Sequence, residues 1–205
     1  MEPTTLSTDR LVLRPFVPAD EAEVYAAAQD ADIQRWTVVP SPYERADAHA
    51  FVNEIVPNGW RDGPAMSFAV RLGAEGPLVA AVGVHVRGTG DFTSHEIGYW
   101  AVKEHRGRGY MTEAVLAVAR WAFTELGATR LEWRAEVGNA GSRAVAEKAG
   151  FRVEGVLRAG IEQRGTSRDC WVGALLPSDL GLPSRLPYLP AEAPIGRQAA
   201  VSQSR

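Results

Sequence analysis

The stretch that decides the fold spans residues 95–126 and reads HEIGYWAVKEHRGRGYMTEAVLAVARWAFTEL. Residues 97–102 are apolar, aromatic and β-branched, which predicts a strand. A charged segment with two glycines follows. From Met111 onward, apolar residues recur every three or four positions, which predicts a helix. Gly127 then stands where a left-handed residue would end that helix. The stretch is predicted to be a strand, a glycine loop and a helix in succession.

The junction between this strand and this helix is suited to anion binding. The first N–H groups of a helix have no partner within the helix, and the helix dipole places partial positive charge at the same end. Gly107 and Gly109 let a phosphate approach the backbone, and Arg106 and Arg108 add positive charge. The alternative is a turn without a ligand, because a lone Gly-x-Gly is a weak signal.

Two common phosphate loops do not match. No Gly-Lys-Ser/Thr follows Gly109, so the Walker pattern is absent, and Thr112 replaces the third glycine of the dinucleotide pattern. Residues 104–109, EHRGRG, instead resemble the acetyl-CoA loop of the GNAT N-acetyltransferase superfamily, Gln/Arg-x-x-Gly-x-Gly/Ala, with Glu104 in the leading position. The continuation GYMTEA is similar to the subgroup typified by ribosomal-protein N-terminal acetyltransferases.

A second motif further along the chain strengthens this resemblance. It is the family-like pattern Asn-x-x-Ser-x-x-Val-x-Glu-Lys-x-Gly-Phe, which begins at Asn139, includes Ser142 and ends at Phe151. Asn139 is also a good helix N-cap and Gly150 a good helix stop. Two independent motifs at family-like spacing make the assignment stronger than either motif alone.

The order of predicted elements agrees with the resemblance. Seven strands and four helices are expected in the order βααβββαβαββ, a mixed central sheet of the GNAT α/β (α+β) type. The strands are expected at 11–16, 68–71, 79–86, 97–102, 130–137, 153–159 and 169–175, and the helices at 18–29, 44–56, 111–126 and 139–149. Trp36 falls in a short connecting segment, Pro57 is expected to break the second helix, and residues 88–94 make a turn. The domain is expected to cover residues 1–180, and residues 181–205, with four prolines, to form a mobile tail.

Composition limits the partners and the cellular compartment expected for this chain. The 205 residues are 45% hydrophobic and 23% charged, with a net charge of −3, which gives no case for nucleic acid or an anionic membrane as partner. No apolar run approaches the roughly 20 residues of a membrane span, and no secretory signal is visible. The one cysteine, Cys170, cannot form an internal disulfide, which favours the cytoplasm. A homodimer is expected only by analogy with the family.

The resemblance implies a reaction and a set of residues that bind its co-substrate. GNAT enzymes transfer an acetyl group from acetyl-CoA to an amine in a ternary complex, without a metal. The implied contacts to acetyl-CoA are made by the end of the strand, the glycine loop, the helix start and the second motif: Ala101, Val102, Arg106, Gly107, Arg108, Gly109, Tyr110, Met111, Thr112, Asn139 and Ser142. Main-chain N–H groups near Ala101 and Val102 are the candidates that polarise the thioester.

Two side chains are candidates for catalysis. Glu96 stands where several family members carry the general base, although a strand-edge carboxylate in a salt bridge is the alternative. Ser142 is the candidate that meets the departing thiolate, because Ala146 occupies the place of the usual catalytic tyrosine. The alternative for Ser142 is a helix cap. The four histidines show no metal-binding spacing.

The acceptor is the least defined part of the prediction. Trp36 is the candidate that contacts the acceptor, and Tyr99 and Trp100 are further candidates to line its cleft. Subgroup resemblance favours a protein N-terminal α-amine, with a small-molecule amine or antibiotic as the alternative. A catalytically silent acyl-CoA sensor and, more remotely, a nucleotide-binding dehydrogenase are the rival functions.

Overall fold

The computed structural model describes residues 2–88 and 94–191 of the chain. In this part of the chain, eight strands form one sheet in the order β1-β2-β3-β4-β5-β6-β8-β7. All neighbouring strands are antiparallel except β5 and β6, which are parallel. The strands are β1 (Leu6–Ser7), β2 (Leu11–Pro15), β3 (Ala65–Leu72), β4 (Leu78–Arg87), β5 (Ser94–Ala101), β6 (Leu131–Glu136), β7 (Arg152–Gln163) and β8 (Thr166–Leu175).

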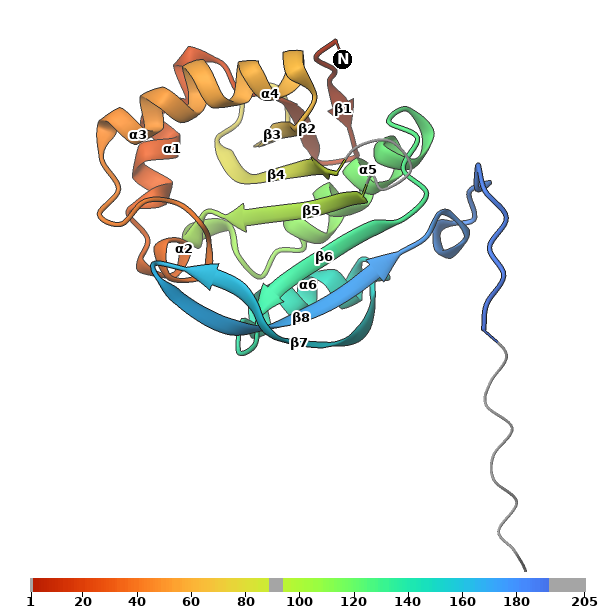
Figure 1. Cartoon of the computed structure of the whole chain (residues 1–205). Helices are drawn as coiled ribbons and strands as arrows, with labels where there is room; N and C mark the ends of the chain where they lie inside the picture. Colours follow the sequence, from red (N-terminus) through yellow and green to blue (C-terminus); the bar gives the residue numbers. More distant parts are fainter. Residues whose placement is uncertain (1, 89–93, 192–205) are drawn as a thin grey trace, which may run out of the picture.

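Helices surround this sheet (Figure 1). They are α1 (Glu21–Ala28), α2 (Ala31–Trp36), α3 (Arg45–Ala50), α4 (Val56–Asp62), α5 (Tyr110–Thr124) and α6 (Ala140–Lys148), with short 3-10 turns at Pro18–Asp20, Lys103–His105 and Pro177–Leu180. Helix α5 buries the apolar stripe that its sequence predicted, including Met111, Val115 and Val118. An aromatic cluster joins α4, β3 and α5: the ring of Phe68 lies 5.1 Å from that of Trp60 and 5.3 Å from that of Trp121.

The parallel pair β5 and β6 separates part-way along its length. Pairing runs through His95–Leu131, Glu96–Glu132 and Ile97–Trp133 and then ends. Beyond this point β5 continues to Ala101 and β6 to Glu136 without pairing to each other. The two strands diverge towards the side on which α2 lies (Figure 1). We refer to the space between them as the β5–β6 gap.

The predicted mixed α/β fold is confirmed, and three of its details are corrected. A short strand, β1, precedes the first predicted one, so the sheet has eight strands among the described residues. The segment around Trp36 is a helix, α2, whose N-cap Asp30 accepts a hydrogen bond from the Asp32 N–H. Pro57 does not end the second helix, because a π-helical turn over Phe51–Ile55 precedes it and the chain remains helical to Asp62. A wider turn accommodates the ring and missing N–H of proline.

Two predicted segments extend outside the described residues. The turn expected at 88–94 includes residues 89–93, and the expected tail includes residues 192–205. The described part of that tail, residues 181–191, contains no helix or strand. Across the described residues, no helix combines the length and the apolar character needed to cross a bilayer.

Candidate active site

The glycine loop connects β5 to α5 and is exposed from Arg106 to Gly109. Gly107 and Gly109 have φ angles of +76° and +79°, in the left-handed region that favours glycine. Gly109 is the N-cap residue of α5, and its carbonyl accepts from the Glu113 N–H at 3.1 Å. The N–H groups of Tyr110, Met111 and Thr112 precede this first turn of helical bonding, so they remain directed out of the helix end. The loop therefore offers the main-chain surface that an anion requires.

The predicted cofactor residues of the loop differ in what their side chains do. Met111 is buried in the core, so only its backbone can contact a ligand. The guanidinium of Arg106 forms ion pairs with Asp30 and Asp32, and its Nε donates to the Ala101 carbonyl at 3.1 Å. Arg106 therefore ties the loop to the start of α2. Arg108 is exposed and has its side chain available at the surface.

The main-chain groups at the end of β5 are divided between β4 and the β5–β6 gap. The Val102 N–H donates to the Val79 carbonyl on the β4 side at 3.0 Å. This engagement corrects the expectation that the Val102 amide is available to a thioester. Because hydrogen-bonding directions alternate along a strand, the N–H groups of Tyr99 and Ala101 point the other way, towards the gap. Ala101 remains the candidate, and Tyr99 joins it.

Ser142 lies where the β5–β6 gap begins, in the first turn of α6. Its N–H donates to the side chain of Asn139 at 3.1 Å, which confirms Asn139 as the helix cap. Its hydroxyl accepts from the Trp133 indole N–H at 3.0 Å and lies 3.4 Å from the Tyr99 hydroxyl. The Tyr99 hydroxyl in turn donates to the Ser142 carbonyl at 2.8 Å. The serine oxygen is thus held by groups from both diverging strands.

The Tyr99 hydroxyl stays protonated in this network. Burial raises the pKa of Tyr99, and the hydrogen bonds from Ser142 and Trp133 offset only part of that rise. The hydrogen bond to Ser142 directs the Tyr99 side chain to α6, whereas strand alternation places Trp100, the other residue predicted to line the acceptor cleft, on the opposite face of β5. The signal was present in the sequence: strand alternation places Tyr99 on the same face as the buried Ile97.

Glu96 projects from the opposite face of β5. It is opposite His85 on β4 and Glu132 on β6, and its side chain is 18% exposed. The Arg87 Nε donates to its Oε2 at 2.9 Å, and the Arg134 Nε lies 4.0 Å from the same oxygen. Burial lowers the pKa of His85, Glu96 partly restores it and Arg87 lowers it further. The site on this face therefore combines a carboxylate with an imidazole that favours the neutral form.

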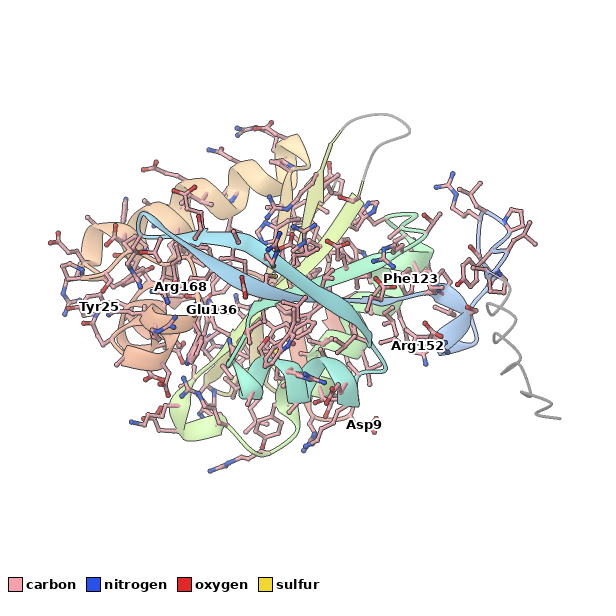
Figure 2. All side chains as sticks on the ribbon, turned by 60° about the horizontal axis from the view of Figure 1, so that its bottom comes forward. Asp9, Tyr25, Phe123, Glu136, Arg152 and Arg168 are labelled. Atoms are coloured by element: carbon pink, nitrogen blue, oxygen red, sulfur yellow. The ribbon has the colours of Figure 1, made fainter. Side chains whose placement is uncertain are left out.

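Trp36 is the last residue of α2. Its ring stacks on the guanidinium of Arg35 at 4.1 Å, and its Cη2 approaches to 3.6 Å the position that a Cβ on Gly138 would take. Arg35 also makes a bidentate ion pair with Glu136 at the end of β6, with both N–O distances 2.7 Å. Arg168 on β8 approaches the same carboxylate at 3.4 Å (Figure 2). These contacts fix α2 against β6.

The hairpin of β7 and β8 also holds α2. The Gln163 side chain donates to the carbonyls of Arg35 and Thr37 at 3.2 and 2.6 Å. Arg164 donates to the Gln34 carbonyl at 2.6 Å. Sequence reasoning missed this support because the residues are 126 to 130 positions apart and share no motif. Among the described residues, no cluster of three or more His, Cys, Asp or Glu has the arrangement of a metal site.

Comparison with known proteins now identifies the arrangement. The model of the acetyltransferase (GNAT) domain family matches residues 10–152, which is more than half of the chain. This chain belongs to the GNAT acetyltransferase family. The matched residues include the glycine loop, the diverging strands β5 and β6, and the second motif.

Individual relatives agree with this assignment. "Probable N-acetyltransferase YjcK" of Bacillus subtilis is 37% identical over 112 residues, covering 55% of this chain and 62% of YjcK. "Putative ribosomal N-acetyltransferase YdaF" of the same species is 43% identical over 81 residues, covering 40% of this chain and 44% of YdaF. The matches thus span less than two thirds of the length of these two relatives. Mycobacterium smegmatis RimJ, solved with a CoA-disulfide, has a TM-score of 0.76 and 25% identity, covering 88% of this chain and 92% of RimJ.

Proposed function

We propose that this chain transfers an acetyl group from acetyl-CoA to a primary amine by direct attack in a ternary complex. The observation that supports this most is the juxtaposition of the glycine loop with the β5–β6 gap. The loop presents backbone N–H groups to the phosphates of coenzyme A, and the gap presents the Tyr99 and Ala101 N–H groups to its pantetheine arm. The CoA-disulfide bound to the similar RimJ is consistent with this assignment.

Ser142 is the proposed partner of the departing thiolate. Collapse of the tetrahedral intermediate breaks the C–S bond, and the thiolate then requires a proton or a hydrogen bond. The Trp133 indole and Tyr99 hydroxyl fix the serine oxygen beside the start of the gap. The Ala101 N–H is the proposed donor to the thioester oxygen, where negative charge develops.

Glu96 is the proposed general base. It accepts the proton of the attacking amine directly or through water, while a hydrogen bond from Arg87 holds its Oε2. Glu96 and Ser142 project to opposite faces of β5, so the reacting carbonyl would lie between them at the gap. The acceptor would approach from the Glu96 face, where Arg35 and Glu136 hold Trp36 in position.

A protein N-terminal α-amine is the proposed acceptor class, and the cytoplasm the proposed compartment. The name of YdaF points to ribosomal substrates. Chemistry agrees, because an α-amine with a pKa near 8 costs about 1.4 kcal/mol to deprotonate at pH 7, whereas a lysine costs about 4.6 kcal/mol. A single carboxylate base meets the smaller cost more readily. A small-molecule amine remains the second acceptor class.

Release of free CoA thiol from acetyl-CoA tests the proposal. The acceptors are a peptide with a free N-terminus, an Nα-blocked lysine peptide and a small polyamine. We expect the first to turn over fastest and Glu96→Gln to lower kcat about 100-fold. Glu54→Gln, at an exposed position of the helix before α4, is the matched control and should retain full activity.

The same assay distinguishes an acetyltransferase from an acyl-CoA sensor. A catalytically silent acyl-CoA sensor would bind acetyl-CoA without releasing thiol in the presence of any acceptor. The hydrogen bond from Arg87 to Glu96 favours this second function, because a general base must exchange such a partner for the amine.

A further inference from the structure

An N-terminal segment reaches the glycine loop from the far end of the sequence. Thr8 and Arg10 lie between β1 and β2, and both contact Glu113 in the first turn of α5. The Arg10 Nε donates to Glu113 Oε2 at 2.7 Å, and the Arg10 backbone N–H donates to Oε1 at 3.3 Å. Thr8 donates its hydroxyl to Oε1 at 2.5 Å. The Glu113 carboxylate is thus held by three donors from one turn.

Arg10 also contacts the loop itself. Its guanidinium donates to the Arg108 carbonyl at 3.1 Å and stacks on the Tyr110 ring at 4.7 Å. A Cβ added at Gly109 would lie 3.6 Å from its Nη2. One side chain therefore lies along the loop from residue 108 to residue 110. With the side chain 46% exposed, part of the guanidinium still faces solvent beside the loop.

Glu113 by itself would oppose phosphate binding. It places a negative charge in the first turn of α5, at the end where the proposed pyrophosphate would sit. Burial raises the pKa of Glu113, but the hydrogen bonds from Thr8 and Arg10 and the charge of Arg10 outweigh it, so the pKa is lowered and the group is ionised. The charge of Arg10 compensates the charge of Glu113 at this point. The hydrogen bond from the Arg10 guanidinium to the Arg108 carbonyl directs that carbonyl towards the protein.

We propose that Arg10 is a positioning residue for the phosphate end of the acyl donor. It fixes the Arg108 carbonyl away from the ligand and neutralises Glu113, so that the loop presents only N–H groups and positive charge to a diphosphate. The proposal rests on the proposed use of acetyl-CoA. It has a specific consequence, because Arg10 would favour donors that carry phosphates and would have no effect on a thioester of pantetheine.

Steady-state kinetics with two donors, acetyl-CoA and S-acetylpantetheine, test this inference. For Arg10→Met we expect the KM for acetyl-CoA to rise about 10-fold, equivalent to about 1.4 kcal/mol. The kcat should be unchanged, and kcat/KM with S-acetylpantetheine should stay within about twofold of wild type. Adding Glu113→Gln to Arg10→Met should recover part of the lost affinity, because it removes the uncompensated charge. Arg61→Met, an exposed arginine of α4, is the matched control.

Each outcome decides between the alternatives. Equal losses with both donors would show that Arg10 supports the fold in general and would overturn the inference, as would an unchanged KM for acetyl-CoA. If Arg10→Met is unstable, Arg10→Lys keeps the charge but loses the two-pronged contact, and it should show a smaller rise confined to acetyl-CoA. A wild-type protein that binds no CoA in calorimetry would overturn the proposed function itself and this inference with it.

Discussion

Replacing Gly107 by alanine tests the phosphate loop most sharply. Gly107 adopts φ +76°, and a Cβ built there meets no heavy atom within 4 Å. The added methyl group therefore meets no protein atom and projects into the open space beside the loop. In our account that space belongs to the pyrophosphate of the donor, so the methyl group should obstruct the ligand rather than the fold.

The expected magnitudes separate these two effects. A left-handed alanine costs about 1 kcal/mol of folding free energy relative to glycine. One charge-assisted hydrogen bond to a phosphate is worth about 1.5–3 kcal/mol, so losing one should raise the KM for acetyl-CoA roughly 10- to 100-fold. The loss of donor affinity should thus be larger than the loss of folding stability, so reduced stability alone would not explain it.

Gly63→Ala is the matched control. Gly63 ends α4 at φ +83°, and a Cβ there also meets nothing within 4 Å. Both variants should lose about 1 kcal/mol in urea unfolding, but only Gly107→Ala should weaken CoA binding in calorimetry. An equal CoA affinity for the two variants would refute the reasoning that phosphates occupy the space in front of Gly107.

Three further predictions follow from buried contacts. Ser142→Ala should lower kcat at least 10-fold with an unchanged KM for acetyl-CoA, whereas Tyr99→Phe, which keeps the ring, should cost less; equal rates for Ser142→Ala and wild type would exclude the thiolate role. Asp20→Asn should destabilise the protein by about 3 kcal/mol in urea unfolding, because Asp20 is 1% exposed and pairs with Arg14 and Arg71. Burial raises the pKa of Asp20, but Arg14, the Val17 N–H and Arg71 lower it by more, so the pKa lies below its ordinary value. Wild-type stability should therefore fall as the pH drops below about 4, and Asp20→Asn should lose this dependence.

Local patterns in the sequence were enough to predict most of the fold. The periodicity from Met111 predicted the buried stripe of α5, and Asn139 predicted the cap of α6, because both depend on residues within a few positions of each other. Pro57 does not break the second helix as its residue type predicts, because its effect depends on whether the preceding turn can widen. Helix α2 was missed because its stability comes from contacts with Glu136 and Gln163, more than 100 residues away.

In the candidate site too, features set by local sequence were predictable, and features set by distant contacts were not. The glycine loop was predictable because its φ angles require glycine at two nearby positions. The engagement of the Val102 N–H by Val79 depends on the register of β4 against β5, which no spacing rule reveals. The pairing of Arg106 with Asp30 and Asp32, and of Arg10 with Glu113, likewise joins distant segments whose charges look unremarkable in sequence.

A crystal structure of the protein with coenzyme A tests the central claim most directly. We predict pyrophosphate oxygens at about 3 Å from backbone N–H groups of residues 107–112, and the pantetheine arm in the β5–β6 gap with its sulfur near the Ser142 hydroxyl. Coenzyme A bound elsewhere, or a gap closed by continued pairing of β5 with β6, would contradict the account.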